Sequence, residues 1–376
     1  MNYKILILVV VFITMLTFSY GFFVGQYKIF PYEIFQEFKY KTLTENSQNT
    51  NFVIDEYIYE IDPGDLIQIN SKFDVLEKRD SLINYIWKNQ DYPKNIFPSN
   101  IYEDISDEKL STLNNLKSIN KLVIKMEYDV NSIAYLLIPE KNNEKLIIYH
   151  HGHGEDFRQN IRIFEYFLER DYSVLAFSMP LSGMNNQPTV EISELGIIKL
   201  INHNRLKFLE NQEFSPIKFF VEPIIVSLNY VENNFEFDSY HFVGISGGGW
   251  TGIIYSAIDD RVSDTFSIAG SLPLYLRADP QNFGDYEQEL PSLYSISNYL
   301  ELYVLGGYGQ DRKLIQIFNK NDPCCFAGEV SSLYSDSVKN VLEQLSMGYF
   351  DVLIDENDQH NISDVTLEKI HQIINS

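Results

Sequence analysis

From about residue 119 onward, short apolar runs alternate with longer stretches whose apolar residues recur at helical spacing. The apolar runs predict strands at 122–128, 132–139, 145–152, 172–178, 240–246, 264–270, 313–319 and 349–355. The intervening stretches predict helices, including one from Trp250, one near 293–305 and one near 336–344. Because several strands are apolar on both faces, the pattern is typical of a mostly parallel sheet covered on both sides. The predicted fold class is α/β, with helices on both faces of the sheet and residues 119–376 as one domain.

Before residue 119 the chain does not show this alternation of predicted strands and helices. Residues 71–87 carry apolar side chains at helical spacing and predict a helix that packs on the main domain. Residues 44–51 are polar and favour a loop or linker. We therefore interpret residues 26–118 as an N-terminal extension that packs on the core.

Residues 5–25 form an apolar segment of about 21 residues without a charged side chain. A helix of that length can cross a bilayer, so residues 1–25 predict a membrane helix that acts as a signal anchor. A cleaved signal peptide, which would release a secreted protein, stays open because Ser19 and Gly21 are small residues at a possible cleavage site. Lys4 precedes the segment and Lys28, Lys39 and Lys41 follow it, so the positive-inside count does not favour an exported C-terminus. From the extreme N-terminal placement we expect a membrane-anchored protein whose main domain is exported, to the periplasm or the cell exterior.

The charge of the chain disfavours one class of binding partner, and its cysteine content limits the disulfides that it can form. The chain has 52 acidic and 29 basic residues, a formal charge of -23, which would repel phosphate backbones and disfavours nucleic acid as a partner. The only cysteines are the adjacent Cys324 and Cys325, so an ordinary disulfide framework within the chain is excluded. Two free thiols near a strand end are favoured over a vicinal disulfide, and the redox state stays open.

The predicted strand 240–246 ends in a glycine-rich turn, Gly244-Ile245-Ser246-Gly247-Gly248, before a predicted helix. A serine in such a turn presents its hydroxyl at a helix N-terminus, where negative charge is favoured, and its neighbours must lack side chains. This is the setting of a nucleophilic serine. A phosphate-binding loop is the alternative, but no Lys-Ser/Thr pair follows the glycines. Ser246 is the predicted nucleophile.

A nucleophilic serine needs a base and a carboxylate that orients the base. Asp322 follows the predicted strand 313–319, and His360 lies in a polar loop after strand 349–355. An ordinary Asp-Pro turn and an exposed loop histidine are the alternative interpretations. Three further acids compete for the carboxylate role: Asp351, Asp355 and Asp358. The first two fall within the predicted strand, and Asp358 is very near His360 in sequence, so Asp322 and His360 are the predicted acid and base.

The reaction also needs donors for the developing oxyanion. Gly247 supplies the N–H that follows the nucleophile, and His153 is predicted to supply a second backbone amide from the loop after strand 145–152. A zinc site formed by His150, His151 and His153 is a competing interpretation, but no further Cys or His lies nearby to complete it. The sequence therefore predicts no metal and no cofactor.

The motifs His-His-Gly-His-Gly at 150–154, Gly-Ile-Ser-Gly-Gly-Gly at 244–249, Asn-Lys-Asn-Asp-Pro at 319–323 and Asp-Gln-His-Asn at 358–361 follow one another in the order of the α/β-hydrolase superfamily. The segment 119–376 resembles that superfamily, and within it bacterial secreted esterases of the dienelactone-hydrolase or acetylxylan-esterase-like group. The resemblance implies cleavage of a carboxylic ester through an acyl-enzyme, with a small-molecule ester or acyl compound as substrate. The Ser-Gly-Gly-Gly turn is also similar to that of prolyl-oligopeptidase-type peptidases, so a peptidase stays open. A membrane-tethered binding module on the same scaffold is the non-enzyme alternative, and the oligomeric state is open.

Overall fold

The computed structural model of the chain describes residues 56–376 except 89 and 155, together with residues 3, 12, 14, 15, 17, 19–21 and 24. The chain divides into two compact units, Met1–Val53 and Ile54–Ser376. Most of the predicted membrane segment 5–25 lies outside the described residues. Among those that are described, no helix has the length and apolarity needed to span a membrane.

The second unit is built on a nine-stranded sheet with the order β1-β2-β3-β5-β4-β8-β9-β10-β11. Its strands are β1 (Asn100–Tyr102), β2 (Leu116–Lys125), β3 (Asn131–Pro139), β4 (Lys145–His150), β5 (Ser173–Phe177), β8 (Ser239–Ile245), β9 (Val262–Ile268), β10 (Lys313–Asn319) and β11 (Tyr349–Asp355). The pairs from β1 to β5 are antiparallel, and every pair from β5 to β11 is parallel. A separate antiparallel ribbon joins β6 (Thr189–Ile192) and β7 (Gly196–Lys199). The predicted mostly parallel sheet is confirmed.

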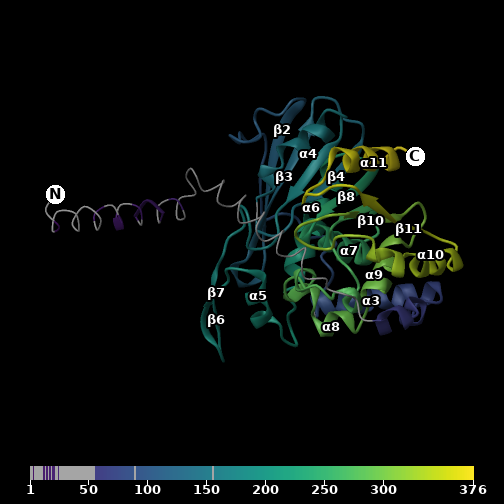
Figure 1. The fold of residues 1–376 in the computed structure, drawn as a ribbon. Helices are drawn as coiled ribbons and strands as arrows, with labels where there is room; N and C mark the ends of the chain where they lie inside the picture. Colours follow the sequence, from purple (N-terminus) through teal and green to yellow (C-terminus); the bar gives the residue numbers. More distant parts are fainter. Residues whose placement is uncertain are drawn as a thin grey trace. The chain divides into compact units, whose positions relative to one another are not determined.

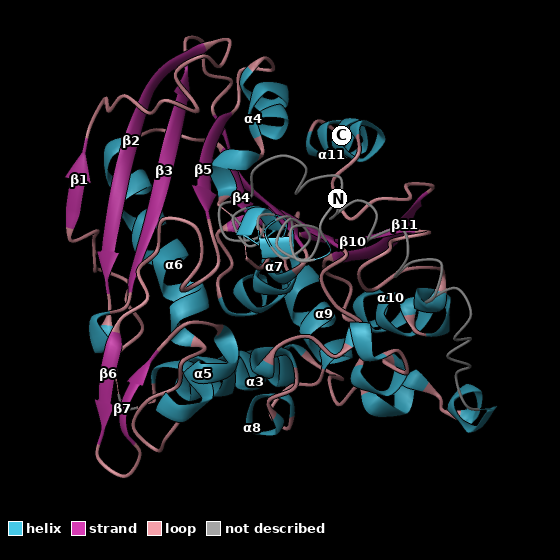
Figure 2. Cartoon of the chain, turned by 60° about the vertical axis from the view of Figure 1, so that its left-hand side comes forward, coloured by secondary structure: helices cyan, strands magenta, loops and turns pink. Residues whose placement is uncertain are grey.

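Helices cover both faces of the sheet, as Figures 1 and 2 show. They are α3 (Lys72–Trp87), α4 (Ile161–Leu168), α5 (His203–Leu206), α6 (Lys218–Asn234), α7 (Gly247–Ile258), α8 (Pro291–Tyr294), α9 (Tyr299–Gly307), α10 (Ser335–Gln344) and α11 (Asp364–Ile374). Helices α4 and α11 belong to one hydrophobic cluster, and α3, α6, α7, α9 and α10 to the other. Successive side chains of a strand point to opposite faces. In β4, accordingly, Leu146 and Ile148 join the second cluster, whereas Ile147 and Tyr149 join the first.

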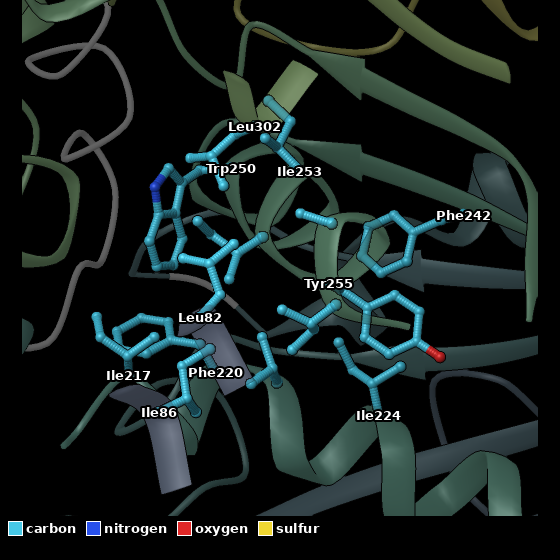
Figure 3. Packing of buried hydrophobic residues seen from close by; sticks show 14 of the residues in the cluster. Leu82, Ile86, Ile217, Phe220, Ile224, Phe242, Trp250, Ile253, Tyr255 and Leu302 are labelled. Atoms are coloured by element: carbon cyan, nitrogen blue, oxygen red, sulfur yellow. The ribbon is translucent and has the colours of Figure 1, made fainter. Parts of the chain in front are cut away.

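Helix α3 shows how the part of the chain before residue 119 joins the core. Ser71 caps the helix by accepting a hydrogen bond from the backbone N–H of Asp74, at 3.3 Å. Leu82 and Ile86 are fully buried in the same cluster as Phe220 of α6 and Trp250 of α7 (Figure 3). The predicted helix over residues 71–87 is therefore confirmed, and it packs on the sheet-bearing unit.

Two elements differ from the sequence-based expectation. The helix expected near 293–305 is broken into α8 and α9, because Asn298 and Glu301 form a reciprocal capping box that starts a new helix at Tyr299. The strands β1, β6 and β7 were not predicted. The sheet extends upstream of residue 119 through β1 and the first residues of β2.

Candidate active site

Ser246 occupies the turn between β8 and α7, which we call the nucleophile turn (244–248). Its backbone angles are φ 55° and ψ −127°, a conformation that costs a non-glycine residue about 1–3 kcal/mol. The surrounding backbone approaches closely, because a Cβ atom added to Gly248 would lie 2.1 Å from the carbonyl oxygen of His150. A Cβ on Gly152 would lie 2.8 Å from the Cβ of Ser246. The glycines at these two positions therefore let the loop after β4 lie directly against the nucleophile turn.

Asp322 and His360 come from the loops that follow the neighbouring parallel strands β10 and β11. The structure brings them together, with His360 Nδ1 2.8 Å from Asp322 Oδ2 and 3.0 Å from Oδ1. The Asp322 side chain is fully buried, whereas that of His360 is 20% exposed. In an open α/β sheet, the carboxyl ends of the strands gather reactive groups. The paired carboxylate orients the imidazole, which is the arrangement that a general base requires.

Asn319, the last residue of β10, connects the loop that carries Asp322 with the loop that carries His360. Its side-chain amide donates to Asp322 Oδ2 at 3.1 Å and to the backbone oxygens of Gln359 and Asn361 at 2.9 and 3.1 Å. The backbone N–H of Cys324 also donates to Asp322 Oδ1, at 2.9 Å. The orientation of the acid is therefore fixed by the end of β10 and by its own loop, and the same Asn319 amide ties that strand end to the loop of His360.

Two of the rival acids have other partners. Asp355 accepts hydrogen bonds from the hydroxyls of Ser363 and Thr366 at the start of α11. Asp351 forms an ion pair with Lys339, at 2.7 Å. Both carboxylates therefore bind partners other than His360. The carboxylate paired with His360 is that of Asp322.

The adjacent Cys324 and Cys325 interact with the candidate catalytic residues His360 and Ser246. The sequence did not predict this proximity. Both are free thiols, and their sulfur atoms are 2.7 Å apart. The hydrogen bond from Cys325, followed in effect by one from His360, lowers the pKa of Cys324 to about 5. The interaction with Cys324 and burial together raise the pKa of Cys325, which also contacts the hydroxyl of Ser246. Cys324, the more acidic thiol of the pair, therefore interacts with His360, and Cys325 interacts with the hydroxyl of Ser246.

The environment of His360 acts on its pKa in two directions. Burial lowers the pKa, but hydrogen bonds to Asp322 and Cys324 outweigh it and raise the pKa to about 10. Within the part of the chain that the structure describes, no hydrogen bond joins the Ser246 hydroxyl to His360. Catalytic hydrogen bonds are often loose before substrate binds. The described geometry thus contains the acid–base pair and the strained serine, with the cysteine pair in contact with both.

The two residues predicted as oxyanion donors, Gly247 and His153, are in contact through the side chain of His153. The first N–H groups of a helix have no partner inside it, and Gly247 supplies the first of these in α7. The imidazole of His153 packs against Gly247, since an added Cβ there would lie 2.4 Å from His153 Cε1. Sequence reasoning assigned His153 a role through its backbone alone. In the structure its side chain also reaches Glu287, with His153 Nε2 3.0 Å from Glu287 Oε1.

The three histidines of the loop after β4 do not form a metal site together. His150 is buried between Phe177 and Phe242, and its Nδ1 lies 2.9 Å from the backbone oxygen of His151. Burial lowers the pKa of His150 to about 3. His151 Nδ1 contacts the side chains of Tyr149 and Asn160, at 3.0 and 3.1 Å. Among the described residues, the groups of possible metal ligands include His153 but neither His150 nor His151.

A pocket of about 640 Å³ opens beside His153. It is lined by His153, Gly154, Leu181, Ser182, Gly183, Asn185, Gln187, Lys199, Ile201, Asn202, His203 and Asp285. Most of these residues fall within 180–216, the segment that contains β6, β7 and α5. Because His153 also packs on Gly247, the pocket adjoins the nucleophile turn.

No protein-family model and no curated protein matches the chain, but solved structures do. Acetyl xylan esterase 1 from Thermoanaerobacterium sp. is similar with a TM-score of 0.54 and 14% identity, covering 80% of this chain and 92% of that one. An acetyl xylan esterase from Paenibacillus sp. R4 has a TM-score of 0.53 and 14% identity, over 82% and 95%. The glucuronoyl esterase from Solibacter usitatus has a TM-score of 0.53 and 11% identity, over 79% and 91%. The chain has the α/β-hydrolase fold.

This likeness confirms the resemblance inferred from the motifs at the level of the fold. In an α/β-hydrolase fold, the nucleophile turn and the loops after later strands form the active site, and Ser246, Asp322 and His360 occupy those positions. Sequence reasoning missed three residues near the site, namely His203, Asp285 and Glu287. Each lies at least 35 residues from every predicted site residue in sequence, and no motif connects them.

Proposed function

We propose that the chain is a serine hydrolase that cleaves a carboxylic ester through an acyl-enzyme. The single observation that carries the proposal is the 2.8 Å contact between Asp322 and His360, which follow β10 and β11 of the same sheet in which the strained Ser246 follows β8. The three similar solved structures described above are esterases by title, which supports an ester rather than another acyl substrate.

In the proposed reaction, His360 Nε2 takes the proton of Ser246 as its Oγ bonds to the ester carbonyl carbon. Asp322 holds the Nδ1–H of the imidazole and stabilises the imidazolium. The backbone N–H groups of Gly247 and His153 bind the oxyanion. The carbon–oxygen bond to the alcohol then breaks, and His360 returns the proton to the leaving oxygen. A water molecule, deprotonated by His360, releases the carboxylic acid and restores Ser246.

The test is covalent labelling of the full chain with a fluorophosphonate probe. We expect Ser246→Ala to abolish both labelling and hydrolysis of a panel of esters with graded acyl length. Ser295→Ala, which changes an exposed serine in the turn after α8, is the matched control and should leave both unchanged. Labelling that survives Ser246→Ala would overturn the assignment. Absence of labelling in the folded native chain would favour the binding-module alternative, and preference for aminoacyl amides would favour a peptidase.

We also propose that the apolar segment 5–25 anchors the protein in a membrane, with the catalytic unit exported. The support is the run of about 21 residues without a charge. The native full chain should stay in the membrane pellet after alkaline carbonate washing, and the Val9→Arg/Leu16→Arg variant should be released. N-terminal sequencing of the mature protein distinguishes a retained anchor from a cleaved signal. Release of the native, uncleaved chain would contradict anchoring.

A further inference from the structure

Four potential metal ligands gather beside the nucleophile turn, from three segments far apart in sequence. His153 comes from the loop after β4, His203 from the first turn of α5, and Asp285 and Glu287 from a short 3-10 turn at residues 285–288. One ligand atom from each of the four lies within 4.8 Å of the others. The sequence gives no hint of this cluster, since only the fold brings the segments together.

The Asp285 distances within the cluster match the edges of a coordination tetrahedron, and the two Glu287 distances are a few tenths of an ångström shorter than those edges. Glu287 Oε1 is 3.0 Å from His153 Nε2 and 3.0 Å from His203 Nδ1. Asp285 Oδ2 is 3.5 Å from the same atom of His153 and 3.6 Å from that of His203. A zinc ion with ligands at about 2.0–2.2 Å in tetrahedral geometry separates them by roughly 3.3–3.6 Å. The four atoms therefore surround a point that suits such an ion.

The proton positions on His203 also favour a cation at this point. His203 Nε2 lies 2.9 Å from the backbone oxygen of Pro180, and a carbonyl oxygen only accepts, so Nε2 carries a proton. A neutral His203 then directs the lone pair of Nδ1 at the Glu287 carboxylate, 3.0 Å away. Two negative electron pairs at that distance require something positive between them, which is a second proton or a metal ion. An imidazole whose outer N–H donates to a backbone carbonyl is the usual arrangement of a metal-ligating histidine.

Glu287 adds a second, independent observation. Its side chain is fully buried, and a buried carboxylate is costly unless a positive charge and hydrogen bonds compensate it. Its Oε1 faces both histidines, while Oε2 is buried without a hydrogen-bond partner among the described residues. A cation bound at Oε1 would compensate the negative charge of this buried carboxylate.

We propose that His153 Nε2, His203 Nδ1, Asp285 Oδ2 and Glu287 Oε1 bind one divalent cation of the zinc class. Two imidazole nitrogens favour zinc over magnesium or calcium, which prefer sites made of oxygen ligands. Four protein ligands fill a tetrahedral shell, so the site is structural rather than hydrolytic. The side chains of His153 and Asp285 are 30% and 33% exposed, which gives the ion access from the pocket. The bound ion would join the three segments and fix the His153 ring against Gly247.

A second cluster, Cys324, Cys325 and His360, also has metal-ligand geometry. These residues surround the proposed catalytic base, so a metal there would occupy the lone pair that the base needs. This cluster is therefore the competing site, and the experiment must separate the two. Thiolate ligation gives cobalt a sulfur-to-metal charge-transfer band that nitrogen and oxygen ligands do not produce.

The test uses the full chain, stripped of metal with a chelator and titrated with ZnCl₂ by calorimetry. We expect one zinc ion per chain, and an affinity reduced at least ~100-fold by Asp285→Asn, since altering even an outer partner of a ligand costs ~10–100-fold. Asp311→Asn, at an exposed loop aspartate outside the cluster, is the matched control and should bind as the native chain does. With CoCl₂, the native chain should show tetrahedral visible absorption without a thiolate charge-transfer band. Zinc should also raise the melting temperature in a concentration-dependent way.

Three results would overturn the proposal: no zinc binding at micromolar concentrations, an affinity unchanged by Asp285→Asn, or binding lost in Cys324→Ser/Cys325→Ser. Circular dichroism verifies that each variant folds. If Asp285→Asn does not fold, the cobalt spectrum of the native chain alone decides between the two clusters. The inference does not depend on the hydrolase proposal, because Ser246→Ala should bind zinc as tightly as the native chain.

Discussion

At the scale of single residues, the groups around His360 set the pH response of the proposed triad. A histidine acts as a general base only in its neutral form. Although burial lowers its pKa, Asp322 and Cys324 raise it to about 10 from an ordinary value of 6.5. Because the proton is held more tightly than usual, the neutral base accumulates only as the pH rises well above 6.5. In a plot of kcat/KM against pH, the rising part of the curve should therefore lie at higher pH than it would for a histidine with the ordinary pKa of 6.5.

Cys324→Ser should move that rising part of the curve toward lower pH. The substitution removes the thiolate that helps to hold the His360 proton, while Asp322 stays in place. The measurement is the pH dependence of kcat/KM with a p-nitrophenyl ester. Cys325→Ser is the matched control, since its hydroxyl can still donate to Cys324, and Cys324 rather than Cys325 raises the pKa of His360. Superimposable profiles for Cys324→Ser and the native chain would show that the thiolate has no influence on the base.

The residues of the proposed triad were predictable because each occupies a position that sequence encodes. Ser246 lies between glycines that a tight turn requires, and Asp322 and His360 follow apolar runs that end in polar loops. The neighbours of these residues were not predictable in the same way. The contact of Cys324 with His360 depends on how two loops fold over each other, and that of His153 with Glu287 joins segments 134 residues apart.

At the scale of elements, the nucleophile turn depends on backbone approach rather than on side-chain contacts. The start of α7 lies so close to the end of β4 that any side chain at Gly248 would meet the main chain of His150. Main-chain atoms cannot rotate away as a flexible side chain can. A substitution there must move the whole junction between β4, β8 and α7.

We therefore expect Gly248→Ala to lower the free energy of unfolding by about 1–3 kcal/mol or more and to abolish fluorophosphonate labelling. Urea denaturation and the labelling assay measure the two effects. Gly64→Ala serves as the control, because its new methyl group would meet only the side chain of Asp62, at 3.1 Å, and should be tolerated. Native-like labelling of Gly248→Ala would mean that the junction is less tightly packed than these distances imply.

The elements themselves were predicted unevenly, for physical reasons. The strands β10 and β11 match the expected bounds because each is an apolar-rich run between polar turns, buried in β10 and mostly half-buried in β11. The strands β1 and β7 were missed because they are mostly exposed and show no buried periodicity. The break between α8 and α9 had a readable signal, the spacing of Asn298 and Glu301 that forms a capping box. The apolar residues on both sides of that break obscured it.

At the scale of the whole unit, residues 54–376 form one compact body, and α3 is part of its core. Trp87 at the end of α3 donates a hydrogen bond to Glu222 of α6, at 2.7 Å. Lys78 forms an ion pair with Glu301 of α9, at 3.0 Å. A helix held by buried contacts to several others unfolds together with them. The unit should therefore lose α3 and the sheet in one transition.

Leu82→Ala tests this cooperativity, since Leu82 is fully buried between α3 and the core (Figure 3). Truncating a buried leucine costs about 2–5 kcal/mol, and in a single cooperative unit that loss lowers the midpoint of the whole transition. Urea unfolding followed by both far-UV and near-UV circular dichroism should give coincident curves, shifted together by the substitution. Phe73→Ala, on the same helix but 70% exposed, should leave both curves in place. A separate early transition in Leu82→Ala would instead mean that α3 detaches while the sheet stays folded, and that the extension is an independent layer on the catalytic core.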